Sequence, residues 1–438
     1  MVAVKSVGVR KGQFEFGGAS IDGNVVSVIT GPNGAGKTDI LCAIAENIRS
    51  DSYFPNGISG VVSRLICQTF SPFSRFSEGH GREGGVASSY RDGLDDLSFY
   101  ISLGITKSKP FRSSRVAVEV LERAILGVSQ SEERANHFFR FLSAVGFLER
   151  CAINFRFYPA ASRFLKAMRR GERFAQEVVR SGEGKRALSE LRRQIDLDGW
   201  REVFEVIDVS LSTIGESSRE VLVDFGRDAV GSSLAFARFQ ALSVLRRLKM
   251  VDVNEVRVFR KSGEALGITS TSSGEQQFLC SMLGLAGTVR NESIILIDEP
   301  ELSLHPRWQI DYAGHLMELL KLVGGCHVLI ATHSPLITQG FLNHGCEVIS
   351  LRAKGGGQSI NRMAKSVEGV LVDVFDSPVP SSLYLADELM RIISLDQESG
   401  CSKEDALDRL NALEHTFLES PEDIKLIRDA KRLVSDDE

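Results

Sequence analysis

Asp298 and Glu299 stand side by side, directly after the apolar run 294–297 and before Pro300. An uninterrupted aliphatic run is typical of a strand that is buried on both faces of a parallel sheet. Open α/β sheets bind ligands at the carboxyl ends of their strands, where this pair would lie. The first carboxylate could bind a magnesium ion that holds nucleotide phosphates, and the second could take a proton from an attacking water. Two solvated acids at an ordinary strand end are the alternative interpretation, which a phosphate-binding loop elsewhere would disfavour.

Residues 31–38 predict such a loop, because they match the pattern G-x-x-x-x-G-K-[ST] in full. The apolar strand 24–29 precedes them, and a helix with one apolar face follows. Glycines let backbone N–H groups turn toward a phosphate, and the positive end of the helix dipole faces the same anion. Lys37 would reach the β- and γ-phosphate oxygens, and the Thr38 hydroxyl would bind the magnesium ion. The candidate ATP-binding residues of this segment are Gly31, Pro32, Asn33, Gly34, Ala35, Gly36, Lys37, Thr38 and Asp39.

Two further polar residues follow apolar runs that read as buried strands. Gln68 comes after 61–67, and His333 comes after 326–331. If these strands join the same parallel sheet, both side chains lie at the edge where Asp298 emerges. Gln68 could then contact the magnesium ion or the attacking water, or it could be a plain polar strand end. His333 could reach the γ-phosphate.

The segment Ser272–Gln277 opens a predicted helix over 278–288. Ser273, Gly274 and Glu275 stand at its N-terminus, where a hydroxyl and free backbone N–H groups can bind an anion. Taken alone, this segment is only a helix cap. His305 is harder to place, because it could cap the next helix or belong to a loop that faces a second protomer.

Residues 77–255 differ in character and carry predicted helices over 114–127, 131–149, 160–181, 185–195 and 232–249. Between 151 and 195 there are 11 Lys and Arg against 4 Glu, with aromatic residues interleaved. This pattern is compatible with a nucleic-acid surface, and equally with a solvated helical face above core aromatics. The candidate nucleic-acid contacts are Arg163, Arg169, Arg170 and Arg173.

The composition is that of an ordinary soluble globular protein, with 438 residues, 43% hydrophobic residues and a formal net charge of −5. Seven cysteines without a C-x-x-C pair predict reduced thiols and a cytoplasmic location. We expect no signal peptide, because the N-terminus lacks a sustained apolar region. We also expect no membrane association, because no apolar run approaches the ~20 residues of a transmembrane helix. The tail from 386 to 438 holds 15 acidic against 7 basic residues, which predicts a solvated helical cap or a docking surface for a partner.

In order along the chain, these motifs resemble the Walker A, Q-loop, signature, Walker B and H-loop motifs of ATP-binding-cassette (ABC) ATPases. The resemblance covers roughly 1–76 and 256–350. Gln68 and Ser273 are 205 residues apart. This spacing resembles that of the SMC, Rad50 and RecF branches, which have large helical insertions between these two motifs, and it disfavours a transporter subunit. The sequence 298–306, together with Ser-Ser-Gly-Glu-Gln-Gln and Thr-His-Ser-Pro, resembles the motifs of the OLD-like or AAA_21 ATPases. Proteins of this group occur in anti-phage systems such as Septu, retrons and PARIS.

The resemblance implies an α/β fold of the ABC-type P-loop NTPase head, with a mostly parallel sheet, a large helical insertion and a helical C-terminal tail. The expected divisions are 1–76 and 256–370 for the two parts of the head, 77–255 for the insertion and 371–438 for the acidic tail.

The same resemblance implies a magnesium-dependent ATPase that works as a homodimer, or a higher oligomer, with ATP between two heads. The implied catalytic residues are Glu299, Lys37, His333 and Gln68. Thr38, Gln68 and Asp298 would bind Mg²⁺, while Ser273 and Gly274 of the second copy would cap the γ-phosphate.

We expect no nuclease domain in this chain, since residues after 333 lack the acidic strand motifs of Toprim domains and no H-N-H cluster is found. The implied function is therefore control of a separate effector, of nuclease class, in an anti-phage defence complex. The alternative is a chromosomal DNA-repair ATPase of the RecF or Rad50 type that acts on DNA.

Overall fold

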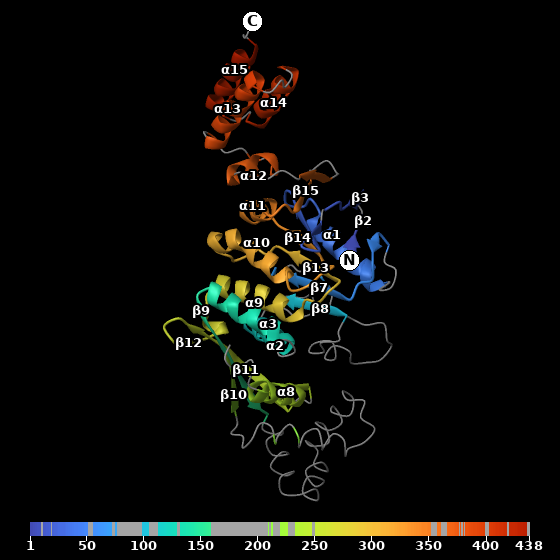
Figure 1. The fold of residues 1–438 in the computed structure, drawn as a ribbon, viewed down its shortest axis with the longest axis vertical. Coiled ribbons are helices and arrows are strands. Elements are labelled where there is room, and N and C mark those ends of the chain that lie inside the picture. Colours follow the sequence, from blue (N-terminus) through green and yellow to red (C-terminus); the bar gives the residue numbers. More distant parts are fainter. Residues whose placement is uncertain are drawn as a thin grey trace, which may run out of the picture.

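A sheet with six parallel strands forms the middle of the molecule (Figure 1). Their order across the sheet is β15 (Glu347–Leu351), β5 (Asn24–Thr30), β14 (His327–Ala331), β13 (Ser293–Asp298), β7 (Arg64–Thr69) and β8 (Tyr100–Gly104). β16 (Gly357–Ile360) and β4 (Ser20–Ile21) pair antiparallel with β15 and β5. The first five parallel strands are buried along their whole length, which explains why apolar residues predominate in them. The predicted α/β class with a mostly parallel sheet is confirmed.

The computed structural model describes the chain except for residues 10–11, 19, 51–55, 72–74, 77–98, 105–112, 129–131, 159–208, 210–211, 213–219, 227–232, 248–249, 352–356, 361–365, 376, 378–379, 381, 399–402, 418–419 and 436–438. In the part it describes, no helix is long and apolar enough to cross a membrane.

Helices cover both faces of the sheet, so that two separate apolar cores form. On one face, α1 (Lys37–Ser50) packs its apolar side, including Ile40 and Ile44, against alternate residues of the sheet such as Leu329. β1 (Ala3–Val4), β2 (Ser6–Val9), β3 (Gly12–Glu15) and β6 (Ile58–Ser59) belong to this side. On the other face lie α9 (Ser273–Thr288), α10 (Pro306–Leu320) and α11 (Pro335–Asn343).

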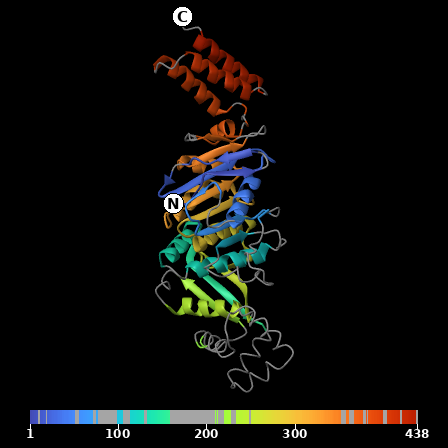
Figure 2. The ribbon, with the colours of Figure 1, turned by 90° about the vertical axis from the view of Figure 1, so that its right-hand side faces the viewer.

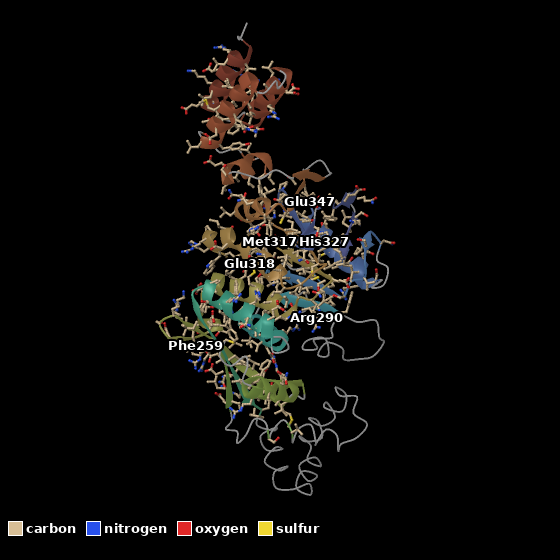
Figure 3. All side chains as sticks on the ribbon, in the orientation of Figure 1. Phe259, Arg290, Met317, Glu318, His327 and Glu347 are labelled. Atoms are coloured by element: carbon tan, nitrogen blue, oxygen red, sulfur yellow. The ribbon has the colours of Figure 1, made fainter. Side chains whose placement is uncertain are left out.

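A buried polar network attaches the N-terminal strands to this sheet. The Nδ1 atom of His327 accepts a hydrogen bond of 2.9 Å from the backbone N–H of Val4. The proton of this imidazole is therefore on Nε2, which lies 3.1 Å from the hydroxyl oxygen of Ser27. The Ser27 hydroxyl donates to Glu347 at 2.9 Å, and the backbone N–H of Gly17 donates to the same carboxylate at 3.1 Å. Figure 3 shows His327 and Glu347 close together within the sheet region.

This network predicts a loss of stability in acid. Burial lowers the pKa of His327 to about 3, with a smaller contribution from the Lys5 cation. Below about pH 6.5 the unfolded chain binds a proton that the folded chain excludes, so stability falls by about 1.4 kcal/mol per pH unit down to about pH 3. The free energy of unfolding can be measured with urea at pH 7 and at pH 4.5. We expect it to decrease between these pH values in the wild type, and we expect the decrease to be smaller by roughly 2–3 kcal/mol in His327→Gln. Equal losses in both proteins would contradict this assignment.

The insertion between β7 and α9 contains strands as well as the predicted helices. Three predicted helices are confirmed as α2 (Ser113–Val128), α3 (Glu132–Ala144) and α8 (Ser233–Arg247), whereas residues 159–208 with the other two lie outside the described part. A second, antiparallel sheet has the order β10 (Glu220–Gly226), β9 (Phe147–Phe157), β11 (Val251–Arg260) and β12 (Ala265–Gly267). The insertion lies below the central sheet in Figure 1. It contains both helices and strands, so the prediction of a wholly helical insertion was wrong. One of its strands, β8, joins the main sheet.

Of the interleaved aromatic residues in the described part of the insertion, Phe155 and Phe157 are core residues, whereas Tyr158 is exposed. Phe155 and Phe157 on β9 are buried, and the Phe155 ring packs against Phe239 of α8. The exposed face of the same strands carries cross-strand ion pairs, in which Arg150 binds Asp224 and Arg156 binds Glu220. For these residues the structure favours a solvated face above core aromatics.

The helix pair α2 and α9 is in direct backbone contact. A Cβ atom built on Gly127 of α2 would lie 1.6 Å from the carbonyl oxygen of Gly287. A Cβ atom built on Gly287 of α9 would in turn lie 2.3 Å from the Cα atom of Ala124. Neither position can accept a side chain unless the two helices move apart.

Gly127→Ala should therefore destabilise the protein by about 3 kcal/mol, the upper end of the usual cost of overpacking, because the clash is with backbone and cannot be relieved by a rotamer change. The matched control is Gly314→Ala on α10, where a new Cβ meets no atom within 4 Å. That change should stabilise the protein by about 0.5–1 kcal/mol, since glycine is a poor helix former. Urea unfolding of the two variants tests the contrast, and a shift of the same sign in both would contradict it.

The C-terminal tail forms a helical bundle at one end of the molecule (Figure 2). After α12 (Val367–Asp373) it comprises α13 (Leu383–Glu398), α14 (Lys403–Thr416) and α15 (Pro421–Ser435). Leu385, Leu410 and Ile427 belong to its separate apolar core. Glu414 forms ion pairs with Arg428, at 2.8 Å, and with Lys431. The predicted helical tail is confirmed.

Candidate nucleotide-binding site

The loop 31–36 joins the end of β5 to the first residue of α1. Gly31, Gly34 and Gly36 have φ values of +145°, +75° and +103°, which side-chain-bearing residues rarely adopt. A Cβ atom on Gly31 would also lie 2.6 Å from the carbonyl oxygen of Leu351 on β15. Since α1 begins at Lys37, its free N–H groups face this loop, as an anion-binding loop requires.

Lys37 is buried at the centre of this loop, with 5% of its surface exposed. Its Nζ atom donates to the carbonyl oxygens of Gly31 at 2.8 Å and Pro32 at 3.2 Å. Burial lowers the pKa of Lys37 to about 8, while the carboxylates of Glu301, Glu299 and Asp298 raise it in part. A buried ammonium group among backbone carbonyls is well placed to bind phosphate oxygens as a point charge.

Thr38 and Asp298 provide the oxygen atoms that a magnesium ion would need. The Thr38 hydroxyl lies 3.0 Å and 3.1 Å from the two carboxylate oxygens of Asp298. Burial raises the pKa of Asp298 to about 7, so its negative charge is costly without a nearby cation. Hydroxyl and carboxylate oxygens are ligands that Mg²⁺ prefers, and the pair therefore fits this ion.

Glu299 begins a tight turn directly after β13. Its φ of +51° is left-handed, and its backbone N–H donates to the carbonyl oxygen of Ala331 at 2.9 Å. Ser303 in the same turn has φ +61°. Such backbone strain costs of order 1–3 kcal/mol per residue and persists where the surrounding structure holds it. The turn therefore fixes the direction in which the Glu299 carboxylate leaves the strand.

His333 follows β14 and lies beside Lys37, with 3.2 Å between its Nδ1 atom and Nζ. Burial and the Lys37 cation lower the pKa of His333, so the imidazole is neutral and its Nδ1 atom accepts. Lys37, Thr38, Asp298, Glu299 and His333 are thus brought together at the carboxyl end of three neighbouring parallel strands, as predicted.

The signature segment lies apart from this cluster. Ser272 caps α9 in a capping box with Glu275, in which each side chain accepts from the backbone N–H of the other residue. In front of it is a cavity of about 880 Å³ that is lined by 272–275 and by residues of 303–308, among others. Residues 31–38, all of which the structure describes, do not line this cavity.

A family model for "AAA domain, putative AbiEii toxin, Type IV TA system", named AAA_21, matches residues 26–338. The chain belongs to the AAA_21 family. The matched range contains the phosphate-binding loop, Asp298, Glu299 and His333, so this AAA_21 protein is a P-loop ATPase.

The AAA_21 protein is also similar to a solved structure, the Smc head domain with an extended coiled coil bound to the C-terminal domain of ScpA, derived from Pyrococcus furiosus. The two chains are 11% identical, and the similarity covers 82% of this chain and 97% of that chain with a TM-score of 0.29.

Gln68 is placed away from the magnesium pair of the AAA_21 site. It is 1% exposed; its Nε2 atom donates to the carbonyl oxygen of Ser281 at 3.0 Å, and its Oε1 atom accepts from the Ser281 hydroxyl at 2.9 Å. Both ends of the amide are thus bonded to α9. The assignment of Gln68 as a catalytic residue and metal ligand remains a prediction.

The structure places the other candidate residues as follows. Asp39 lies on α1 and forms an ion pair with Arg75. The Nδ1 atom of His305 accepts from the backbone N–H of Arg307 at 3.3 Å, which makes His305 the N-cap of α10. Arg163, Arg169, Arg170 and Arg173 lie outside the described residues.

Glu301 is a site residue that the sequence motifs did not indicate. Its carboxylate accepts from the Thr332 hydroxyl at 2.8 Å and from the backbone N–H of His333. Burial raises the pKa of Glu301, although these hydrogen bonds lower it in part. An acid two residues after a Walker B pair was a signal, but sequence alone cannot separate a solvated acid from one that binds a neighbouring loop.

Proposed function

We propose that this chain hydrolyses ATP with magnesium in pairs of heads, and that the cycle controls a separate effector of nuclease class in an anti-phage defence complex. The observation that carries the ATPase part is the cluster at the sheet edge, where Lys37 lies 3.2 Å from His333 and Thr38 lies 3.0 Å from Asp298.

Each residue of the cluster has a role in phosphoryl transfer. Thr38 and Asp298 would hold Mg²⁺, which would neutralise charge on the phosphates. Lys37 binds the β- and γ-phosphate oxygens, and His333 stands beside it to orient the terminal phosphate. Glu299 accepts the proton of the attacking water. Phosphoryl transfer needs mainly positioning and charge stabilisation, which these side chains supply.

A second copy of the chain completes the site in this proposal. The cavity at 272–275 shares no residue with the P-loop segment 31–38. Ser273 and Gly274 of the second copy cap the γ-phosphate of the bound ATP, in an ABC-type arrangement of two heads. Two equivalent sites then form across an isologous interface with two-fold symmetry. ATP favours the closed dimer because it binds both heads only in that state, and hydrolysis releases it.

Two features support the defence role. The family description names a toxin of a type IV toxin–antitoxin system, which favours defence over chromosomal repair. The sequence 298–306 also resembles the corresponding segment of the OLD-like ATPases of anti-phage systems. Since the motifs for nuclease chemistry were not found in the sequence, the proposed effector is a separate protein.

The test is affinity capture of tagged Glu299→Gln from the native host, with ATP and Mg²⁺ and after nuclease treatment, followed by mass spectrometry. Lys37→Met, which cannot hold ATP, is the matched control. A stoichiometric small nuclease or other toxic protein that is captured only with Glu299→Gln would support control of an effector. Repair and replication proteins would support the RecF-type alternative, a permease would support a transporter, and recovery alone would contradict a stably bound effector.

A further inference from the structure

We infer that Glu301 is a positioning residue for ATP hydrolysis, whose carboxylate holds the loop after β14 so that the imidazole of His333 stays beside Lys37. The inference rests on the proposed ATPase function, because it concerns the same site.

Two donors of one short segment converge on the Glu301 carboxylate. The Thr332 hydroxyl binds one carboxylate oxygen at 2.8 Å, and the His333 backbone N–H binds the other. The Thr332 oxygen also accepts from the backbone N–H of Ser334 at 3.0 Å, and Ser334 is the N-cap of α11. Glu301 thereby fixes all three residues that connect β14 to α11, and His333 is the middle one.

The turn that carries Glu301 is itself held from the opposite side by α9. The carbonyl oxygen of Pro300 accepts from the Gln277 side chain at 3.3 Å. The carbonyl oxygen of Ser303 would lie 2.5 Å from a Cβ atom on Gly274. Within the turn, the backbone N–H of Leu304 donates to the carbonyl oxygen of Glu301 at 3.0 Å. Because its backbone is fixed, Glu301 offers its carboxylate to the His333 loop from a constant position.

A carboxylate suits this position better than an amide. Both neighbours are donors, and an ionised carboxylate only accepts hydrogen bonds. A glutamine would direct its NH₂ group toward one of the two donors and lose that bond. The position is half-buried, and the attraction between the Lys37 cation and this carboxylate favours its charged form.

The test is a double-mutant cycle on steady-state ATP hydrolysis with Glu301→Gln, His333→Ala and the combination of both. We expect Glu301→Gln to lower kcat about 10–100-fold, with the KM for ATP changed much less. If Glu301 acts through His333, the same change in the His333→Ala background should lower kcat less than about 2-fold further. Thr332→Val, which removes one of the two donors, should give a smaller loss in the same direction.

Glu347→Gln is the matched control, because Glu347 also accepts from one hydroxyl and one backbone N–H, those of Ser27 and Gly17. It should lower the thermal midpoint without changing kcat. Two results would overturn this inference but not the proposed function. One is a loss of kcat in the double variant that equals the product of the two single losses. The other is a kcat that falls in proportion to the thermal midpoint in both Glu301→Gln and Glu347→Gln. A wild-type protein that does not hydrolyse ATP would overturn the proposed function as well.

Discussion

Replacing Glu299 with glutamine should leave ATP binding intact and slow turnover by about 10²–10⁴-fold, the usual contribution of a general base. Glutamine has nearly the same shape but cannot accept a proton from the attacking water. Neither Lys37 nor the Thr38–Asp298 pair depends on the Glu299 side chain for its hydrogen bonds. Phosphate release under saturating ATP and Mg²⁺, together with a separate titration of ATP binding, measures the two quantities.

The control for this prediction is Glu318→Gln on α10, an exposed carboxylate that is paired with Lys321 across one helical turn. It changes the same chemical group far from the sheet edge and should leave kcat unchanged. Normal turnover in Glu299→Gln would remove Glu299 from the mechanism. Loss of ATP binding in that variant would assign it to nucleotide binding instead.

Lys37→Met should abolish ATP binding and yet leave the nucleotide-free protein as stable as the wild type, or more stable. The ammonium group is buried, and this burial lowers its pKa to about 8 despite the neighbouring carboxylates, so its charge has a folding cost that a bound phosphate would offset. Methionine retains much of the aliphatic stem without the charge. Thermal unfolding with and without ATP separates the effects, because ATP should raise the Tm of the wild type but not of the variant.

Lys321→Met is the corresponding control on an exposed lysine, and it should keep the ATP-dependent rise in Tm. Two results would contradict the prediction. A large drop in the Tm of nucleotide-free Lys37→Met would show that Lys37 stabilises the fold, and a retained ATP effect would show that the loop binds nucleotide without it.

The parallel sheet and the phosphate loop could be predicted because both are encoded locally. Continuous apolar runs mark strands that are buried on both faces, and the spacing of glycines with Lys37 and Thr38 is specific. The register of those strands then brought Asp298 and His333 together without further information.

Other features depend on partners that are distant in the sequence. The predicted helix 131–149 extends into β9, which is a strand in the structure. β9 pairs with β10 and β11, so that Phe155 lies beside Val221 and Val253, and such distant partners cannot be recognised from local sequence. The direction of Gln68 could have been derived from strand alternation. Ile66 and Gln68 share one face of β7 and meet the α9 side, whereas Leu65 and Cys67 pack with α1.

The close contact of Gly127 with Gly287 has a thermodynamic consequence. Because the two backbones touch, α2 cannot shift without α9, whose first residues are Ser273 and Gly274. α2 is also joined to α8 by the ion pair of Glu122 and Arg246. In the proposed dimer, a ligand that displaces the insertion would therefore change the free energy of the ATP-bound state. By reciprocity, ATP would change the affinity of that ligand by the same factor, so the proposed sensing of infection would work at equilibrium without any residue shared between the two sites.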